Sequence, residues 1–367
     1  MAILPTTPLC TLLGIRHPIL LAGMAGGPTT PELVAAVTEA GGLGTFGASG
    51  MRREALIDAI HRARRLTDGP IAVNVLLATP RPGSAELEAF HAALAPIREE
   101  LGLSPPTLPS DPVPTGVELI EIALEAGATI VSTGLGDPAP VVPLARAAGA
   151  PVLAMVATVA DAVQAAESGA DVIVAQGSEA GGHRSNFDLP ESGPPPMVGT
   201  VALVPQIVAA VDVPVVAAGG LMNGSGLIAA LALGAQGIQL GTRFLRTTES
   251  GANPGYRNRL AAAADTDTEI ITAFSGRPAR GLRNRVLEVL EAAGSPTVGY
   301  PRQGSAWADI KAASDRVGSA DATTLWAGQA AALAGDEISA SEVVAQIMAE
   351  AEATLWRLTG AGWSATS

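Results

Sequence analysis

The sequence predicts an α/β fold, a TIM (β/α)8 barrel with a small, mainly helical appended subdomain. Short apolar or β-branched runs alternate with Ala- and Leu-rich stretches of helical spacing, which is typical of a parallel sheet. The runs are apolar almost throughout, and this indicates strands buried on both faces. Eight such runs precede residue 246, the number that closes a barrel. An open doubly wound sheet shares the alternation and is the alternative.

Each predicted strand is rich in Val, Ile and Leu, and most are followed by Gly or small polar residues. This composition favours extended backbone, and the glycines mark where the strands end. The strands are predicted over residues 18–24, 43–48, 71–77, 129–135, 151–157, 171–177, 213–220 and 237–245.

Helical spacing of apolar residues predicts helices between these strands. The junctions EAGGLG, EAGATI, RAAGAP, ESGADV and ALGAQG place Gly after a helix, where a left-handed C-cap is needed, so we interpret these glycines as structural. The helices are predicted over residues 31–41, 52–66, 84–101, 115–126, 138–149, 158–168, 200–211 and 223–233.

Two parts of the chain depart from the alternation. Residues 102–114 form a Pro-rich loop, and residues 246–335 carry helices and a segment rich in Gly and Arg. A last helix is predicted near residues 339–358. The expected organisation is therefore a barrel over residues 1–245, an appended subdomain over 246–335 and a C-terminal segment over 336–367 that packs back on the barrel.

Composition excludes several classes of function. The formal net charge of −13 over 367 residues argues against a nucleic-acid partner, which needs clustered basic residues. Cys10 is the only cysteine, so it forms no intramolecular disulfide or cysteine metal cluster and is interpreted as a small hydrophobe. Lys311 is the only lysine, and its surroundings predict an exposed helix. No secretory signal or membrane-spanning run is visible, so we expect a cytoplasmic protein with no membrane partner.

Glycine-rich strand ends predict an anion site. In a barrel, the loops after strands seven and eight commonly bind phosphate. Gly219 and Gly220 end strand seven, and Gly241 and Thr242 lie in strand eight. Glycine lets backbone N–H groups approach an anion without the help of lysine, and a threonine hydroxyl adds a donor. The alternative is that these glycines only turn the chain.

Two amides on otherwise apolar strands are candidate ring contacts. Asn74 lies on strand three, and Gln176 ends strand six. A buried amide needs hydrogen-bond partners, and a flavin or nucleobase ring offers matching carbonyl and N–H edges. The alternative is that each amide caps a neighbouring strand end.

His183 is the candidate catalytic residue. It follows the double glycine Gly181-Gly182 in the loop after strand six. An imidazole titrates near neutral pH, so it can take a proton from a weak carbon acid. The alternative is a loop histidine that hydrogen-bonds to the backbone.

The other polar residues near these positions are interpreted as structural. His61 and His91 lie on predicted helices, and His17 precedes the first strand. Glu179 and Arg184 flank His183; we expect them to cap a turn or brace the loop rather than take part in the chemistry.

Six segments match a known family, in the same order, between about residue 12 and residue 285. They are PILLAGMAGG, VNVLL, QGSEAGGHRSNFD, PVVAAGGL, GAQGIQLGTRFL and SGRPARGLRNR. On these segments the chain resembles the nitronate monooxygenases, formerly called 2-nitropropane dioxygenases. The resemblance implies non-covalently bound FMN, with a nitronate or nitroalkane and O2 as reactants and His183 as the catalytic histidine. A homodimer is left open, and no metal is implied.

The resemblance also implies which residues hold FMN. Gly23 and Met24 would face the isoalloxazine ring through their backbone, and Asn74 and Gln176 would contact the ring or the ribityl chain. Gly181, Gly220, Gln239, Leu240, Gly241 and Thr242 would hold the ribityl phosphate, and Gly182 and Gly219 complete the predicted cofactor set.

Three further residues leave questions open. Many bacterial members of the family have glycine where this chain has Ser185, a position that could shape access of the substrate. Arg277 and Arg280 lie in the family-like segment SGRPARG. They would either reach an anionic substrate or brace the subdomain.

The implied reaction is oxidative denitrification, in which an alkyl nitronate and O2 give a carbonyl compound and nitrite. His183 would remove the acidic α-proton of a nitroalkane, whereas a nitronate supplied as such needs no proton removal. The first alternative is an NAD(P)H-dependent FMN reductase of the quinone or enoyl-acyl-carrier-protein type on the same barrel. The second is a flavin-binding protein without turnover.

Overall fold

The computed structural model describes residues 6–78, 86–105, 114–190 and 193–360 of the chain. Most of the predicted Pro-rich loop 102–114 and the first two residues of the predicted helix 84–101 lie outside the described residues.

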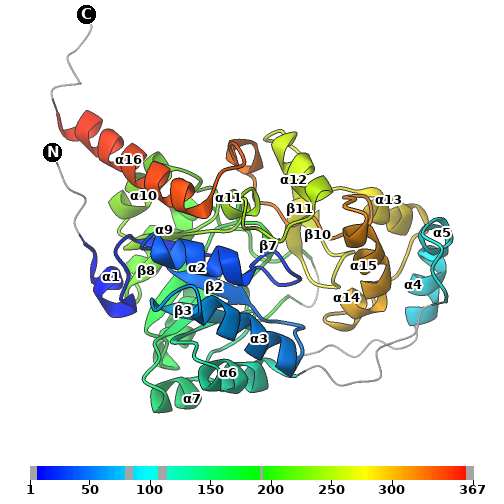
Figure 1. Cartoon of the computed structure of the whole chain (residues 1–367), viewed down its shortest axis with the longest axis horizontal. Coiled ribbons are helices and arrows are strands. Elements are labelled where there is room, and N and C mark those ends of the chain that lie inside the picture. The colour runs from blue at the N-terminus through cyan, green and yellow to red at the C-terminus, as the bar shows by residue number, and fades with distance from the viewer. Residues whose placement is uncertain (1–5, 79–85, 106–113, 191–192, 361–367) are drawn as a thin grey trace, which may run out of the picture.

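Eight parallel strands form a nearly closed barrel, as the sequence predicted (Figure 1). In spatial order the strands run β1-β9-β8-β6-β5-β4-β3-β2, and a single bridge between Leu20 and Leu43 joins the two edges. The strands are β1 (Ile19–Leu21), β2 (Gly44–Gly47), β3 (Ile71–Leu76), β4 (Ile130–Gly134), β5 (Val152–Val156), β6 (Val172–Gln176), β8 (Val215–Ala218) and β9 (Gly237–Leu240). Every residue of β1, β2, β4, β6, β8 and β9 is buried, so these strands are covered on both faces.

The last two barrel strands are shorter than predicted. Strand β8 ends at Ala218 because Gly219 and Gly220 adopt positive φ values of 109° and 73°, which an extended strand does not use. Strand β9 ends at Leu240, and the helix α11 (Thr242–Leu245) follows Gly241 directly. The prediction of strand through residue 245 was wrong because its apolar pattern also suits a short buried helix.

In the part of the chain that the structure describes, eight helices surround the barrel. Seven connect successive strands, and the last, α16, packs against α10 and α2 and completes the ring. The helices are α2 (Pro31–Glu39), α3 (Arg53–Arg64), α6 (Gly116–Glu125), α7 (Val142–Ala147), α8 (Val159–Glu167), α9 (Thr200–Val208), α10 (Gly224–Ala232) and α16 (Ala340–Thr359). The helices α10 and α16 meet closely at Gly224, where a Cβ atom would lie 2.1 Å from the amide nitrogen of Ala351.

The helix predicted over residues 84–101 is not a barrel helix. It is two short helices, α4 (Leu87–Ala93) and α5 (Ala95–Glu100), with Pro96 in the first turn of the second. Phe90, Leu94 and Ile97 pack in a separate core with Phe274. In Figure 1 these helices lie at the far end of the molecule from α16. Apolar spacing predicted that this segment would be helical but could not show which core would bury it.

Most of the chain between β9 and α16 forms a second layer over the C-terminal ends of the barrel strands. Its three-stranded antiparallel sheet has the order β10-β11-β7, and β7 comes from the barrel loop after β6. This pairing ties the loop to the later part of the chain. The elements of the second layer are β7 (Gly182–His183), α12 (Pro254–Ala261), β10 (Thr268–Ile271), β11 (Ala279–Leu282), α13 (Arg285–Ala292), α14 (Arg302–Ala306), α15 (Ala308–Arg316) and the 3-10 helix η1 (Ala331–Leu333). One further helix, α1 (Pro8–Leu13), precedes the barrel.

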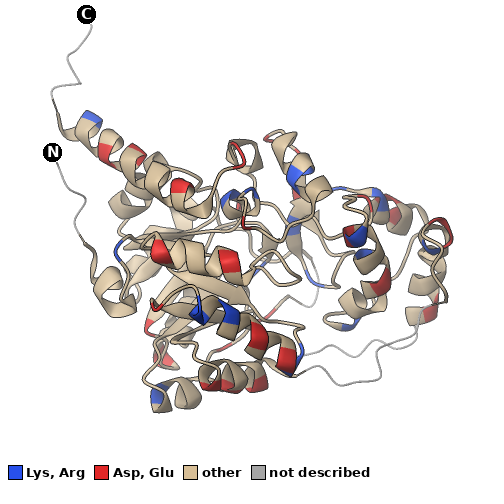
Figure 2. Cartoon of the chain, viewed as in Figure 1, with Lys and Arg blue, Asp and Glu red and all other residues tan. Residues whose placement is uncertain are grey.

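Charge lies outside the barrel strands, none of which contains Asp, Glu, Lys or Arg. Figure 2 shows the charged residues on the surrounding helices and on the second layer, with acidic residues spread over the outer surface. Because the strands carry no charged residue, any charge at the open end of the barrel comes from loops and from the second layer.

Within the described residues no helix is both long and apolar enough to cross a membrane.

Candidate functional site

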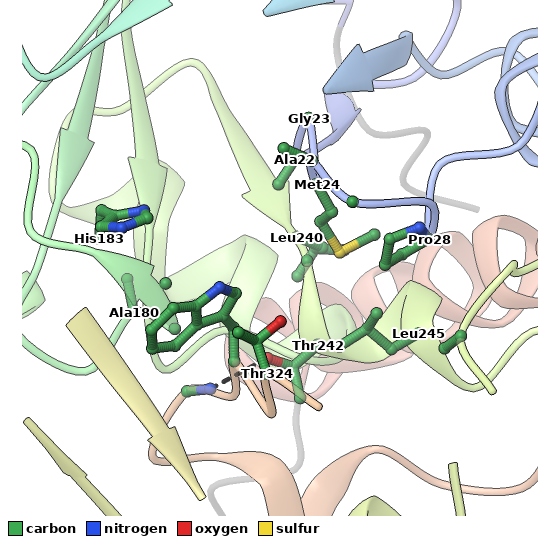
Figure 3. Close-up of a pocket in the computed structure, with 18 of the residues that line it drawn as sticks. Ala22, Gly23, Met24, Pro28, Ala180, His183, Leu240, Thr242, Leu245 and Thr324 are labelled. Carbon is green, nitrogen blue, oxygen red and sulfur yellow. Dashed lines mark hydrogen bonds between the residues drawn. The ribbon is translucent and has the colours of Figure 1, made fainter. Parts of the chain in front are cut away.

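A cavity of about 520 Å³ opens at the C-terminal ends of the barrel strands. Loops in this position carry the chemistry of barrel enzymes. Every residue that the sequence singled out for a cofactor or for catalysis lies on its wall. These residues are Gly23, Met24, Asn74, Gln176, Gly181, Gly182, His183, Gly219, Gly220, Gln239, Leu240, Gly241 and Thr242. In Figure 3 His183 lies on one side of the cavity, with Met24 and Leu240 on the other.

The glycines after β8 and β9 shape one end of the cavity. A Cβ atom on Gly219 would lie 2.8 Å from the amide nitrogen of Ala180, so only glycine fits there without a shift. Gly241 has more room, since its nearest neighbours would be the Ala22 Cβ at 3.5 Å and the Met24 Sδ at 3.6 Å. Glycine in this setting exposes backbone N–H groups that suit an anion.

Thr242 begins helix α11 beside this end of the cavity. Its hydroxyl oxygen accepts a hydrogen bond from the backbone N–H of Gly328 at 3.0 Å (Figure 3). Gly181 lies close to the same segment, because a Cβ on Gly181 would come within 2.7 Å of the Gly328 nitrogen. Residues of the second layer therefore fix the loops that form the predicted phosphate end.

Gly23, which follows β1, is in close contact with Asn74 of β3. A Cβ on Gly23 would lie 2.5 Å from the Cβ of Asn74 and 2.9 Å from the carbonyl oxygen of Phe46. The Asn74 side chain donates to the hydroxyl of Ser132 at 2.9 Å, which fixes the amide on the cavity wall. Glycine at position 23 is thus required by the approach of the Asn74 side chain.

Gln176 uses both ends of its amide to hold the loop that carries His183. Its Nε2 donates to the carbonyl oxygen of His183 at 2.8 Å, and its Oε1 accepts from the backbone N–H of Ser185 at 2.9 Å. Both ends of this amide thus position the loop after β6, and a direct contact of Gln176 with a cofactor stays a prediction.

His183 lies on the two-residue strand β7, opposite Ala279 of β11. Its Nε2 lies 2.9 Å from the hydroxyl oxygen of Ser275, and its ring centroid lies 5.3 Å from that of Trp326 and 5.5 Å from that of Tyr300. Burial, with a smaller effect of the Arg277 cation, lowers the pKa of His183 to about 4. The imidazole is therefore neutral at neutral pH, which is the form that accepts a proton.

Glu179 and Arg184 are structural, as their positions suggested. The Glu179 carboxylate accepts from the backbone N–H of Thr200 at 2.9 Å and from the Thr200 hydroxyl, so it stabilises the first turn of α9. Arg184 is fully buried and donates to the carbonyl oxygens of Gly177 and Gln176 at 2.7 and 3.0 Å. Burial and the Arg280 cation lower the pKa of Arg184 to about 10, which still leaves it protonated at neutral pH.

Arg277 and Arg280 brace the same loop from the second layer. Arg277 donates to the carbonyl oxygen of Asn186, and Arg280 donates to that of Ser178 at 2.9 Å. These contacts answer the question that the sequence left open for both arginines. They hold the His183 loop against β10 and β11.

Several residues of the wall were missed from the sequence. Lys311 was expected on an exposed helix, but its side chain on α15, 26% exposed, lies on the cavity wall in an ion pair with Asp315. Trp326 also lines the cavity, and its carbonyl oxygen accepts from the Tyr256 hydroxyl. No local pattern marks these residues, because they reach the site only through the packing of the second layer. Within residues 6–78, 86–105, 114–190 and 193–360, no cluster of three or more His, Cys, Asp or Glu is placed to hold a metal ion.

Cys10 is buried in an apolar cluster with barrel-strand residues such as Leu20 and Val174. The predicted small-hydrophobe role agrees with this position, remote from the cavity wall.

Comparison with known proteins gives consistent results. The family model described as nitronate monooxygenase matches residues 6–350. A protein of Staphylococcus aureus named probable nitronate monooxygenase is 38% identical over 328 residues, which cover 89% of this chain and 92% of that protein.

Two solved structures are similar over nearly their whole length. The nitroalkane oxidase from Streptomyces ansochromogenes is 35% identical with a TM-score of 0.85, covering 95% of this chain and 99% of that one. FabK from Thermotoga maritima is 30% identical with a TM-score of 0.76, covering 97% of this chain and 99% of that one.

Proposed function

Since the chain belongs to the nitronate monooxygenase family, whose members are flavin-dependent enzymes, we propose that it binds FMN in the cavity and oxidises alkyl nitronates there. With O2 as the oxidant, the products are a carbonyl compound and nitrite. The observation that carries the proposal is the single cavity wall on which the glycine-rich strand ends and His183 meet.

The residues present fit a flavin nucleotide. Gly219, Gly220 and Gly241 leave backbone N–H groups at the ends of β8 and β9 for the phosphate. The amide of Asn74 and the backbone of Gly23 and Met24 lie on the same wall for the ring. When bound, FMN supplies the redox chemistry that connects nitronate and O2. We assign the barrel, residues 1–245, to cofactor binding and residues 246–335 to covering the site.

His183 is the proposed catalytic base for nitroalkanes. Its neutral imidazole takes the α-proton, and the conjugate base that remains is the nitronate, whose charge lies on the nitro oxygens. The hydroxyl of Ser275 holds the imidazole ring in place. The hydrogen bond that the Gln176 side chain donates to the carbonyl oxygen of His183 holds the backbone. A nitronate supplied as such needs no base, so it bypasses this step.

The similarity to FabK favours one second candidate, an NAD(P)H-dependent FMN reductase on the same barrel. The two functions predict different electron donors for the same flavin. The test is therefore a direct comparison in which the FMN-loaded enzyme receives either ethylnitronate with O2 or NADH with a quinone.

Nitrite formation that matches O2 uptake, with slow NADH oxidation, supports the monooxygenase. Rapid NADH oxidation without nitrite formation from nitronate would assign the chain to the reductases. If the protein retains FMN but is inactive with both donors, a flavin-binding protein without turnover is favoured.

A further inference from the structure

One serine joins the ends of two strands on the side of the cavity that faces β9. In the barrel order, β4 lies across from β9. The strands β4 and β5 pair in parallel as far as Thr133 and Ala154. Beyond that pair, the Ser185 hydroxyl donates to the carbonyl oxygen of Met155 at 2.9 Å and accepts from the backbone N–H of Leu135 at 3.2 Å. This one side chain therefore bridges the two strand ends.

Ser185 is itself held in place. Its backbone N–H donates to the Oε1 of Gln176 at 2.9 Å, and the residue is only 1% exposed. The preceding residue, Arg184, is fully buried and bonded to the end of β6. The backbone thus fixes where the Ser185 hydroxyl lies, and the hydroxyl in turn fixes Leu135 and Met155.

Leu135 has a backbone conformation that needs such support. Its φ is +63°, and among the described residues no other non-glycine residue has a positive φ. A side chain in the left-handed region crowds the following carbonyl, so the conformation persists only where the surroundings impose it. The hydrogen bond from the backbone N–H of Leu135 to the Ser185 hydroxyl supplies one such constraint, and Leu135 is only 1% exposed.

The bridged residues form part of the cavity wall. Gly134, Leu135, Met155 and Ser185 all line it, beside Leu76 of β3. Apart from the Ser185 hydroxyl, which is used in the bridge, this stretch presents apolar side chains and backbone. This stretch of wall bounds the side of the cavity opposite the predicted phosphate end at β8 and β9. An alkyl group on that side would find apolar contacts.

We propose that Ser185 is a positioning residue that determines which alkyl groups the site accepts. Its hydroxyl holds Leu135 and Met155 at a fixed separation, and this limits the chain length that fits against the wall. The inference rests on the proposed nitronate site and deepens it, because it assigns the size limit of the substrate to one hydrogen-bonded bridge.

The test compares Ser185→Ala with two matched variants in the FMN-loaded enzyme. Ser185→Thr keeps the hydroxyl, and Ser225→Ala removes a hydroxyl that bonds Thr354 between α10 and α16, away from the cavity. The kcat and KM values are measured for ethylnitronate, butylnitronate and hexylnitronate. We expect Ser185→Ala to raise the ratio of kcat/KM for hexylnitronate over ethylnitronate by about fivefold, mainly through KM, because contacts of single methylenes discriminate on this scale.

Two readouts need no turnover. Propionate, pentanoate and heptanoate resemble ethylnitronate, butylnitronate and hexylnitronate in charge and shape, and their dissociation constants follow from perturbation of the flavin spectrum. Hydrogen exchange of the Leu135 amide reports the bridge itself, and loss of its acceptor in Ser185→Ala is expected to speed exchange by about tenfold. If nitronate oxidation fails but the carboxylate series shifts toward longer chains, the proposed function falls and the role of Ser185 stands.

An unchanged chain-length profile in both series overturns the proposal, whether or not the Leu135 amide exchanges faster. A profile that changes equally in Ser225→Ala also overturns it, because the effect would then be a general loss of stability. If Ser185→Ala does not fold, Leu135→Gly replaces it, since glycine adopts the left-handed backbone without support. That variant must shift the profile toward longer chains, and failure to do so overturns the inference.

Discussion

The Nε2 atom of His183 lies 2.9 Å from the hydroxyl oxygen of Ser275, although 92 positions separate the two residues in the chain. The pairing of β7 with β11 brings them together by placing His183 opposite Ala279. Ser275 is itself fixed by short-range bonds to the backbone of Arg277 at 3.2 and 3.3 Å. The barrel thus supplies the imidazole, and the second layer supplies the group that orients it.

This contact predicts that Ser275→Ala weakens catalysis without abolishing it. The imidazole loses one hydrogen-bond partner and samples other orientations, so kcat/KM for a nitroalkane falls by about tenfold, or about 1.4 kcal/mol. Steady-state assays with nitroethane measure the effect, and Ser275→Thr is the control that keeps the hydroxyl. Equal activities of the wild type and Ser275→Ala would exclude an orienting role for Ser275.

A second prediction separates the base from the rest of the site. His183→Ala lowers the rate with neutral nitroethane by about 10²–10⁴, the range that a general base contributes. The rate with preformed ethylnitronate changes far less, because its proton has already left. His61→Ala, an exposed residue of α3, serves as the control. Equal losses with both substrates would show that His183 acts in some way other than proton removal.

The pH dependence follows from the lowered pKa of His183. Burial and the Arg277 cation disfavour the imidazolium, so the neutral base persists below the ordinary value of 6.5, down to about 4. We expect kcat/KM for nitroethane to show no loss attributable to His183 as the pH falls through 6.5, and to fall as it passes through about 4. Arg277→Met removes the cation, which raises the pKa and moves the acid limb to higher pH. An acid limb at 6.5 in the wild type would contradict this.

The lowered pKa of His183 also makes the free energy of unfolding depend on pH. The unfolded chain protonates this histidine below about 6.5, whereas the folded chain resists protonation down to about 4. Protons therefore bind preferentially to the unfolded state in this window, and the contribution of His183 to the free energy of unfolding is lost as the pH falls from 6.5 to 4. The difference in melting temperature between wild type and His183→Ala, followed across that window, measures this contribution.

Gly241→Ala tests the phosphate end of the cavity. The added methyl group meets Ala22 and Met24 at ordinary distances of 3.5 and 3.6 Å, so the protein without cofactor keeps its melting temperature. The methyl group enters the space beside the exposed N–H groups, and FMN affinity falls by about tenfold or more. Quenching of FMN fluorescence gives the dissociation constant. Gly304→Ala, whose added Cβ has no neighbour within 4 Å, is the control, and equal FMN affinities in the two variants would refute the assignment.

Much of the fold could be predicted because barrel strands and helices have local signatures. Continuous apolar runs marked the buried strands, and glycines such as Gly127 and Gly169, with positive φ after α6 and α8, marked the helix ends. Strand ends also located the cavity, since the chemistry of a parallel barrel gathers at one rim. Local sequence was therefore enough to identify the residues that the barrel contributes to the wall.

The second layer could not be predicted in the same way. The strand containing Gly182 and His183 is two residues long and pairs with a partner nearly a hundred residues later, so no periodic pattern marks it. The residues around Lys311 predicted an exposed helix, and only the packing of the second layer places this side chain on the cavity wall. Contacts between distant segments decide these cases, and the local sequence does not encode them.

Anaerobic titration with ethylnitronate, after the purified protein has been incubated with FMN, examines the flavin and its electron donor together. We expect a visible spectrum of oxidised flavin that is lost stepwise as nitronate is added, and that returns when O2 is admitted with release of nitrite. A flavin spectrum that nitronate leaves unchanged but NADH bleaches would contradict it, as would a colourless protein that does not take up FMN.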